Sequence, residues 1–312
     1  MGQMIIGKKV EKPVLIAKEY QAEYRIEGEK AEFVRYLGEE EEYEVPSFLD
    51  HYPVTRVGAY AFSEHRNLDS VHLPPQLEEI GAHAFYNCRG LKELSLYDKI
   101  SEIEDGAFKN CGNLSHLTLY TMPDHKLVIK NILMDSTEGI GVTIYFEDGE
   151  KRERAEVVFP PYLVEYEENT PARICEKQAY GSGERYRHCL YDGQLNFEQY
   201  DGLFDFAVAV DSLEYPIRIA VNRLRYPYSL KEDGKTEYER FLKENNRKVL
   251  DYYVQREEQE VLEWMLKEKK LSKKEMNLAA ELCRKHQKNS LLPMLMEYQN
   301  RNFKPEKKTF SL

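Results

Sequence analysis

The sequence of 312 residues contains no apolar run that approaches the ~20 residues of a transmembrane helix. The N-terminal segment also lacks a long apolar stretch, because Lys8, Lys9 and Glu11 break it into short patches. It therefore does not have the pattern of a secretory signal peptide. If Met1 is the natural start, we expect a cytoplasmic protein with no membrane span. An extracellular location would require a leader upstream of Met1.

Basic residues are in the minority. The chain has 44 Lys and Arg against 55 Asp and Glu, a formal net charge of −11. General nucleic-acid binding needs a basic footprint, so we expect no nucleic-acid partner. We interpret the densest acidic run, Glu39–Glu42, as a solvated turn between strands.

Cysteine is scarce, and its five residues form no CxxC pair: Cys88, Cys111, Cys175, Cys189 and Cys283. That pattern gives no support to zinc or redox motifs. Cys88 and Cys111 lie one repeat apart and could in principle form a bridge. We favour reduced thiols that act as small buried apolar groups. The sequence also has no HExxH or GxSxG motif, so we expect no enzyme, no metal and no cofactor.

What the sequence does contain is a repeat of 23 residues. Phe62, Phe85 and Phe108 each follow an alanine within VTRVGAYAFSEHRNLDSVHL, LEEIGAHAFYNCRGLKELSL and ISEIEDGAFKNCGNLSHLTL. A single unit cannot bury its apolar residues alone, but a stack of units can. Each unit ends in an apolar–polar–apolar triplet typical of a parallel strand. We therefore expect a short β-solenoid over residues 45–121.

The polar positions around those triplets predict a solvent-facing sheet surface. Repeat proteins often bind partners with such a surface, although the same positions can simply be solvated. The candidate protein-binding face consists of His72, Glu93, Ser95, Tyr97, His116, Thr118 and Tyr120.

The repeat resembles a known bacterial family. The unit Leu77–Cys88 carries Ile-Gly-x-x-Ala-Phe and a following Cys, and it is similar to BspA-like (Treponema-type) leucine-rich repeats. The likeness covers roughly residues 45–120. Two positions depart from it, since His65 replaces the Cys of the first unit and Glu104 the Gly of the third. The resemblance implies a leucine-rich-repeat fold. Family members are often secreted and some are adhesins, but no shared binding motif carries that function over.

Around the repeats the patterns predict an α+β chain. Residues 1–44 are expected to form an N-terminal β-hairpin cap, and residues 122–210 a mixed α/β middle domain. Residues 211–303 are expected to form an ankyrin-like array of helical hairpins, followed by a basic tail at 304–312.

Several local signals support this layout. In the middle domain, Asp148-Gly149 is a favoured hairpin turn. Thr236–Glu239 and Ser272–Glu275 have the pattern of capping boxes that open helices. The 23-residue period ends after Tyr120, because Asn131 stands where the next Phe should fall.

The densest polar stretch lies in the middle domain. The segments NTPARI and GSGERYRHC predict a strand, a glycine turn and a second strand that places Arg185 and Arg187 on one face. With Arg173 they could form a site for carboxylate or phosphate. Alternatively, these arginines pair with nearby carboxylates and hold the domain together. The same stretch resembles a subgroup of Firmicutes leucine-rich-repeat proteins with a helical C-terminal region, which implies layout and no chemistry.

Together these patterns favour a non-catalytic scaffold that binds an unknown protein partner through the sheet face, the helical array or the groove between them. The first alternative is an anion or phospho-ligand sensor or enzyme centred on Arg173, Arg185 and Arg187. A second alternative is a surface adhesin, if a signal peptide was removed.

Overall fold

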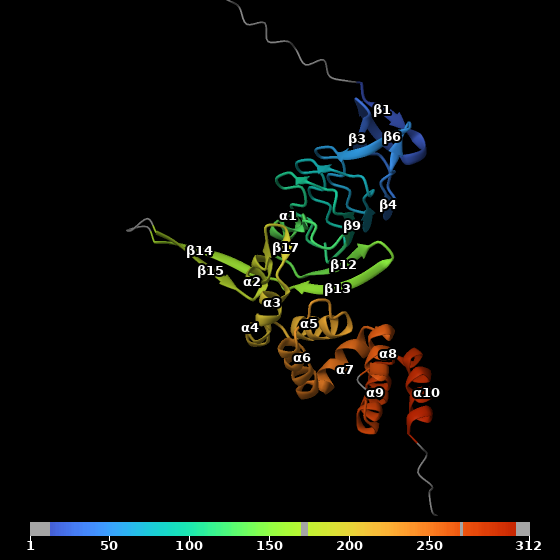
Figure 1. Cartoon of the computed structure of the whole chain (residues 1–312), viewed down its shortest axis with the longest axis vertical. Helices are drawn as coiled ribbons and strands as arrows, with labels where there is room; N and C mark the ends of the chain where they lie inside the picture. Colours follow the sequence, from blue (N-terminus) through green and yellow to red (C-terminus); the bar gives the residue numbers. More distant parts are fainter. Residues whose placement is uncertain (1–12, 170–173, 269–270, 304–312) are drawn as a thin grey trace, which may run out of the picture. The chain divides into compact units, whose positions relative to one another are not determined.

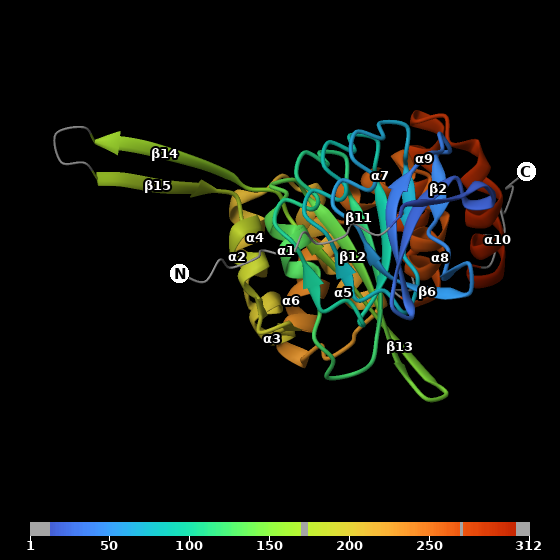
Figure 2. The same ribbon diagram turned by 90° about the horizontal axis from the view of Figure 1, so that it is seen from above.

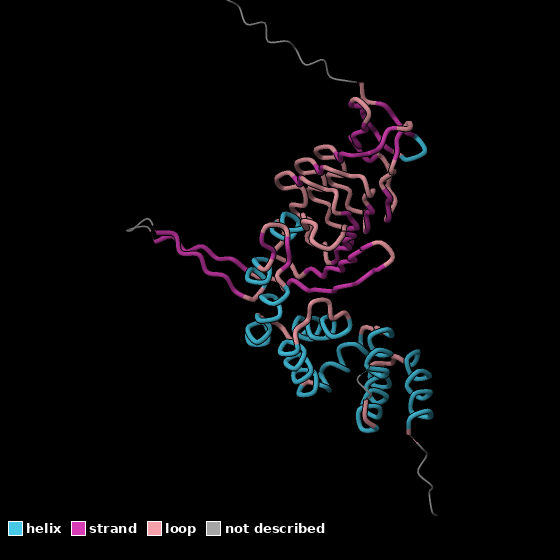
Figure 3. The backbone as a smooth tube through the Cα atoms, viewed as in Figure 1, coloured by secondary structure: helices cyan, strands magenta, loops and turns pink. Residues whose placement is uncertain are grey.

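The computed structural model of the protein describes residues 13–169, 174–268 and 271–303. They form two compact units. The first comprises the described residues up to 215 together with 226–230, and the second comprises 216–225 and the residues from 231 onward. All strands of the described ranges lie in the first unit, whereas the second is helical (Figure 3). The finer division into five segments stays a prediction.

The solenoid contains two sheets, in which many neighbouring strands are parallel, and both sheets run along its length (Figure 1). The first sheet contains β1 (Leu15–Ala17), β2 (Ala22–Glu27), β3 (Lys30–Tyr36), β6 (Tyr52–Val57), β8 (Glu79–Ile80) and β10 (Glu102–Ile103), with β5 (Phe48–Leu49) beside β6. The second sheet contains β4 (Glu42–Glu44), β7 (Ser70–His72), β9 (Glu93–Tyr97), β11 (His116–Thr121), β12 (Ile140–Asp148) and β13 (Lys151–Phe159).

Each repeat contributes one strand to each sheet, whereas the sequence pattern predicted only the strand of the second sheet. In the second sheet the pairing of β7, β9 and β11 is parallel and joins residues 23 positions apart. Between the sheets the Phe rings stack, with 4.8 Å between the centroids of Phe62 and Phe85 and 4.9 Å between those of Phe85 and Phe108. All three rings are buried. Stacked aromatic pairs contribute about 0.5–1.5 kcal/mol beyond their burial, so the ladder favours this register over others.

The N-terminal cap is a hairpin, as predicted, and it also joins the stack. Strands β2 and β3 pair antiparallel around Gly28, whose φ of 65° suits a tight turn. Strand β3 then pairs in parallel with β6. Its Phe33 ring lies 5.1 Å from Phe62 at an interplanar angle of 7°, which extends the aromatic stack by one ring. The period does not reveal this ring, because it precedes Phe62 by 29 residues rather than 23.

The solenoid also continues past Tyr120. Helix α1 (Ile129–Met134) follows the last repeat, and β12 pairs in parallel with β11. The Asn131 side chain donates to the Ile103 carbonyl at 2.9 Å. Ile129 and Ile132 are buried. A short helix therefore replaces the strand in this coil, and the offset between β11 and β12 grows to 25 residues, for example Leu117 to Val142.

The remainder of the first unit surrounds the end of this stack. Strand β13 pairs antiparallel with β12 through the predicted Asp-Gly turn. The next two strands, β14 (Leu163–Asn169) and β15 (Ile174–Tyr180), form a separate ribbon that extends away from the sheets (Figures 1 and 2). The elements that follow are α2 (Gly183–His188), β16 (Leu190–Tyr191), β17 (Gln194–Leu195), α3 (Phe197–Gly202) and α4 (Phe204–Val210).

The second unit is helical, as predicted. Its helices are α5 (Glu214–Arg225), α6 (Glu232–Glu244), α7 (Asn246–Gln255), α8 (Gln259–Glu268), α9 (Lys273–Lys285) and α10 (Leu292–Asn302). Polar contacts tie α7 to the end of α9, since Asp251 lies 3.7 Å from Lys285 and 2.8 Å from His286, which directly follows the helix. The likeness to ankyrin repeats stays a prediction.

One of the two predicted capping boxes is present. The Ser272 hydroxyl caps α9, and the Glu275 side chain accepts from the Ser272 backbone at 2.6 Å. The prediction at Thr236 is wrong, because α6 begins four residues earlier. The Thr236 hydroxyl donates instead to the Glu232 carbonyl inside the helix.

No helix of the described ranges is long and apolar enough to cross a membrane.

Candidate functional site

The outer face of the second sheet collects the predicted face residues. Strands β9 and β11 alternate between buried and more accessible positions. The predicted residues fall on the accessible side, because side chains alternate along a strand. His72 and Glu93 are exposed and the other five are half-buried. In register, Glu93 lies beside His116, Ser95 beside Thr118, and Tyr97 beside Tyr120.

A row of tyrosines is the most distinctive feature of this face. Tyr97, Tyr120 and Tyr145 lie in register on β9, β11 and β12. Their ring centroids are 4.9 Å and 5.3 Å apart, with interplanar angles of 23° and 13°. We call these three residues the tyrosine ladder. Burial is the first cause that raises the pKa of Tyr97, so its phenol stays neutral at physiological pH.

Two arginines from the β13 hairpin complete the ladder. The Arg152 guanidinium lies 4.1 Å from the Tyr145 ring centroid and 5.7 Å from that of Tyr120. Arg154 lies 5.5 Å from Tyr145, and its guanidinium also pairs with Glu156. Cations over tyrosine faces are attracted by the ring quadrupole. Sequence reasoning missed Tyr145 and both arginines, since the 25-residue offset hides them from a 23-residue period.

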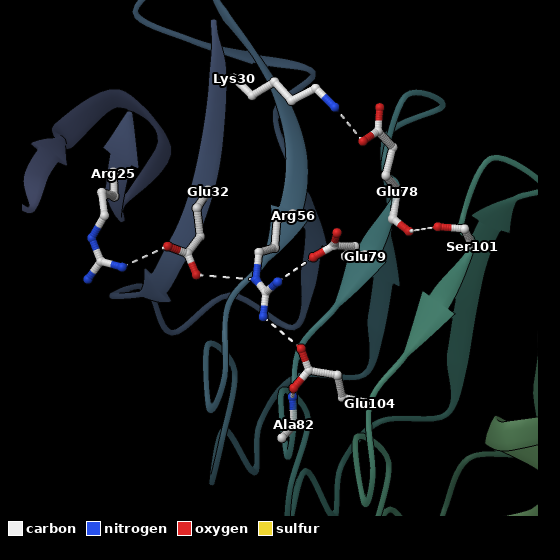
Figure 4. Close-up of polar contacts among 9 residues, drawn as sticks. All are labelled: Arg25, Lys30, Glu32, Arg56, Glu78, Glu79, Ala82, Ser101 and Glu104. Atoms are coloured by element: carbon white, nitrogen blue, oxygen red, sulfur yellow. Dashed lines mark hydrogen bonds and ion pairs between the residues drawn. The ribbon is translucent and has the colours of Figure 1, made fainter. Parts of the chain in front are cut away.

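The first sheet carries a ladder of charges instead of rings (Figure 4). Arg56 on β6 contacts Glu32 on β3, Glu79 on β8 and Glu104 after β10. The Glu104 carboxylate also accepts from the Ala82 backbone N–H at 3.0 Å. This explains why Glu104 departs from the repeat pattern. Its side chain binds both an arginine and the backbone of the preceding coil, so the cluster ties successive coils together.

Comparison with known proteins agrees with this architecture. Residues 49–131 match the family described as BspA type leucine rich repeat region, in six copies. These residues are BspA-type leucine-rich repeats. No curated protein matches the chain. The resemblance to a Firmicutes subgroup with a helical C-terminal region stays a prediction, because the matched residues cover the repeats alone.

Three solved bacterial structures are similar to part of the chain. A T. pallidum leucine-rich-repeat protein shares 27% identity at a TM-score of 0.31, over 35% of this chain and 54% of its own. A leucine-rich-repeat protein from Bacteroides capillosus shares 26% identity at a TM-score of 0.32, over 36% of this chain and 83% of its own. A leucine-rich cell surface protein from Faecalibacterium prausnitzii shares 21% identity at a TM-score of 0.30, over 38% of this chain and 41% of its own. These partial likenesses add nothing on function.

Beyond the leucine-rich repeats, the structure corrects the predicted arginine cluster. Residues 183–188 form helix α2 rather than a strand. Residues two positions apart on a helix point in directions about 200° apart, so Arg185 and Arg187 do not share a face. The Arg185 guanidinium lies 4.1 Å from the Phe206 ring centroid. Arg173 lies outside the described residues.

Arg187 is a buried structural residue, with 1% of its surface exposed. Its Nε donates to the Leu133 carbonyl at 2.8 Å, and its Nη atoms donate to Pro160 and Glu138 at 2.7 Å each. Longer bonds reach Ser136 and Gly183. Burial lowers the pKa of Arg187 to about 10, so it remains charged at neutral pH. Because backbone carbonyls occupy its donors, Arg187 cannot bind an external anion.

Four of the five cysteines and the serine of the Gly-Ser-Gly turn, Ser182, are also buried. Cys88, Cys111, Cys189 and Cys283 are free and buried, whereas the side chain of Cys175 lies outside the described residues. Ser182 is buried and bonds to Asp211 through its backbone N–H and its hydroxyl. Among the described residues, no group of His, Cys, Asp and Glu side chains is placed to hold a metal ion.

Proposed function

We propose that this protein is a non-catalytic scaffold that binds another protein through the outer face of its leucine-rich repeats, centred on the tyrosine ladder. The observation that carries this proposal is the in-register stack of Tyr97, Tyr120 and Tyr145 on a face that is only half-buried. Tyrosine is enriched at binding hot spots, because it supplies a large contact area and a polar tip.

The arrangement of the ladder favours binding energetically. Each ring is held by its neighbours on adjacent strands, so little side-chain entropy remains to be lost when a partner docks. Polar groups lie around the rings, namely Ser95 and Thr118 in the neighbouring row and Arg152 above the ladder. An apolar centre with a polar rim is typical of protein interfaces.

The alternative of an anion sensor or enzyme at the arginine cluster finds no support in the geometry. Arg187 is occupied by carbonyls and Arg185 lies against Phe206. We therefore retain protein binding as the proposed role. The adhesin alternative proposes the same role but places the protein at the cell surface. Fractionation of the source cells, followed by immunodetection of the protein, distinguishes a cytoplasmic from a surface location.

Quantitative affinity capture from a lysate of the source cells tests the binding role. The bait is the full chain as wild type, as the double variant Tyr97→Thr/Tyr120→Thr, or as Tyr191→Thr. Threonine preserves strand propensity, and Tyr191 is a matched control because it is 79% exposed and belongs to the separate β16–β17 sheet. We expect the double variant to lose a captured partner at least tenfold and the control to retain it. Absence of a reproducible partner, or equal capture by all three baits, would contradict the proposal.

A further inference from the structure

A second candidate site lies at the carboxyl ends of three parallel strands. Asp98 follows β9, His125 follows β11, and Phe146 stands near the end of β12. A cleft of about 160 Å³ opens here. Residues that line it include Asp124, His125, Phe146, Gln194, Phe197 and Tyr228. All of them belong to the first unit, and none of them is part of the tyrosine ladder.

One wall of the cleft is fixed by hydrogen bonds. Asp98 Oδ2 lies 2.7 Å from His125 Nδ1 and accepts from the Met122 backbone N–H at 3.0 Å and the Thr121 hydroxyl at 3.1 Å. When Nδ1 carries the proton of the neutral ring, Nε2 is left as an acceptor. The same loop is tied to the β16–β17 turn, since the Leu127 N–H donates to the Gly193 carbonyl. The wall is therefore preorganised.

The opposite wall is aromatic. Tyr228 stacks on Phe146 with 4.0 Å between ring centroids and an interplanar angle of 10°. Phe197 lies 5.4 Å from Tyr228 at 59°. The Phe197 ring is therefore tilted against the Phe146–Tyr228 pair rather than stacked on it. Aromatic faces attract cations within about 6 Å of the centroid.

The charges around the cleft favour a cation over an anion. Asp124 contributes a carboxylate that makes no hydrogen bond or ion pair with another described residue. The nearest lysine in the sequence, Lys126, is paired with Asp192 at 2.7 Å. The pKa of Tyr228 is raised by burial first and then by the charges of Glu153 and Asp124, while Lys151 opposes them. Two carboxylates and one lysine therefore act on this phenol.

We propose that the cleft binds a small organic cation, an alkylammonium or guanidinium group, either as a free compound or at the end of a lysine or arginine side chain. Its volume fits one such group, since an engineered cavity of ~150 Å³ in another protein holds benzene. It is smaller than the ~300 Å³ at which drug-sized ligand pockets begin, which excludes a nucleotide.

Amide chemical shifts of the isotope-labelled full chain test this proposal at constant ionic strength. The probes are methylguanidinium, a peptide Gly-Arg-Gly with both ends blocked, and acetate as the matched anion. We expect methylguanidinium to shift resonances of the loops that form the cleft, and acetate not to shift them. A response to the blocked peptide identifies a protein side chain as the ligand. A response to methylguanidinium alone identifies a free compound.

A pair of matched variants locates the effect. Asp124 and Asp50 both have positive φ, of 65° and 46°, a conformation that asparagine also tolerates. Asp50 is exposed and does not line the cleft. We expect Asp124→Asn to weaken binding of the cation at least fivefold and Asp50→Asn to change it less than twofold. Equal binding by the two variants, a response to acetate, or no response to either cation would overturn the proposal. None of these results bears on the tyrosine ladder, because the two sites share no residue.

Discussion

Replacement of Arg187 by methionine is expected to destabilise the first unit strongly. The substitution removes three short hydrogen bonds to carbonyls, from Leu133, Pro160 and Glu138. Bonds that involve a charged group contribute about 1.5–3 kcal/mol each. Part of this loss is offset, because burial of the charge costs roughly 3 kcal/mol, as the pKa lowered from 12.5 to about 10 indicates. The expected net loss is therefore about 2–6 kcal/mol.

Hydrogen exchange of the β12 and β13 amides measures the stability of the first unit. The single tryptophan, Trp264 in α8, reports on the second unit by fluorescence. At a loss of about 4 kcal/mol, the melting temperature of a unit this size falls by about 8–16 °C. We expect the melting temperature of the first unit, followed by hydrogen exchange, to fall by this amount in Arg187→Met.

Arg185→Met is the matched control, since Arg185 lies on the same helix but is exposed. Loss of its contact with Phe206 should cost less than about 1 kcal/mol. Arg187→Lys should fall between the two, because lysine keeps the charge but has three donors without the planar fork. If Arg187→Met were no less stable than Arg185→Met, Arg187 would not be the structural centre described above.

Three further predictions concern the repeat stack. Gly81→Ala should cost about 1–3 kcal/mol in urea denaturation, because its Cβ would lie 2.7 Å from a backbone nitrogen of the preceding coil. Gly112→Ala, with open space around it, should stay within about 0.5 kcal/mol of wild type, and equal losses would refute the clash. Phe85→Leu should cost about 0.5–1.5 kcal/mol more than Phe108→Leu, because Phe85 stacks on two Phe rings and Phe108 on one; the reverse order of urea midpoints would contradict this. Burial raises the pKa of Cys88 from 9.0 to about 12, so the unfolded chain loses that proton first and stability should fall as pH rises above about 9. Cys88→Ala should show a shallower fall of the urea midpoint between pH 8.5 and 10.5, and an unchanged slope would rule out this cause.

The tyrosine ladder shows what a strict period can and cannot predict. Tyr97 and Tyr120 fall in one row because their 23-residue spacing fixes the register of β9 and β11. Tyr145 joins the row only because α1 lengthens the next coil to 25 residues. The cleft was missed for a related reason. Asp98, Phe146 and Tyr228 are far apart in the sequence, and only the fold brings their segments together.

The sequence by itself determined the solenoid, because each apolar residue of a repeat is buried against its copy 23 positions away and local spacing is therefore sufficient. It also determined the hairpins with glycine turns and the capping box at Ser272, which depend on neighbouring residues alone. Only the tertiary structure decided the role of Arg187. The pattern GERYRH is compatible with a strand or a helix. The carbonyls that hold Arg187 include Leu133, which is 54 residues away. A side chain whose partners are that distant carries no local signal of its burial.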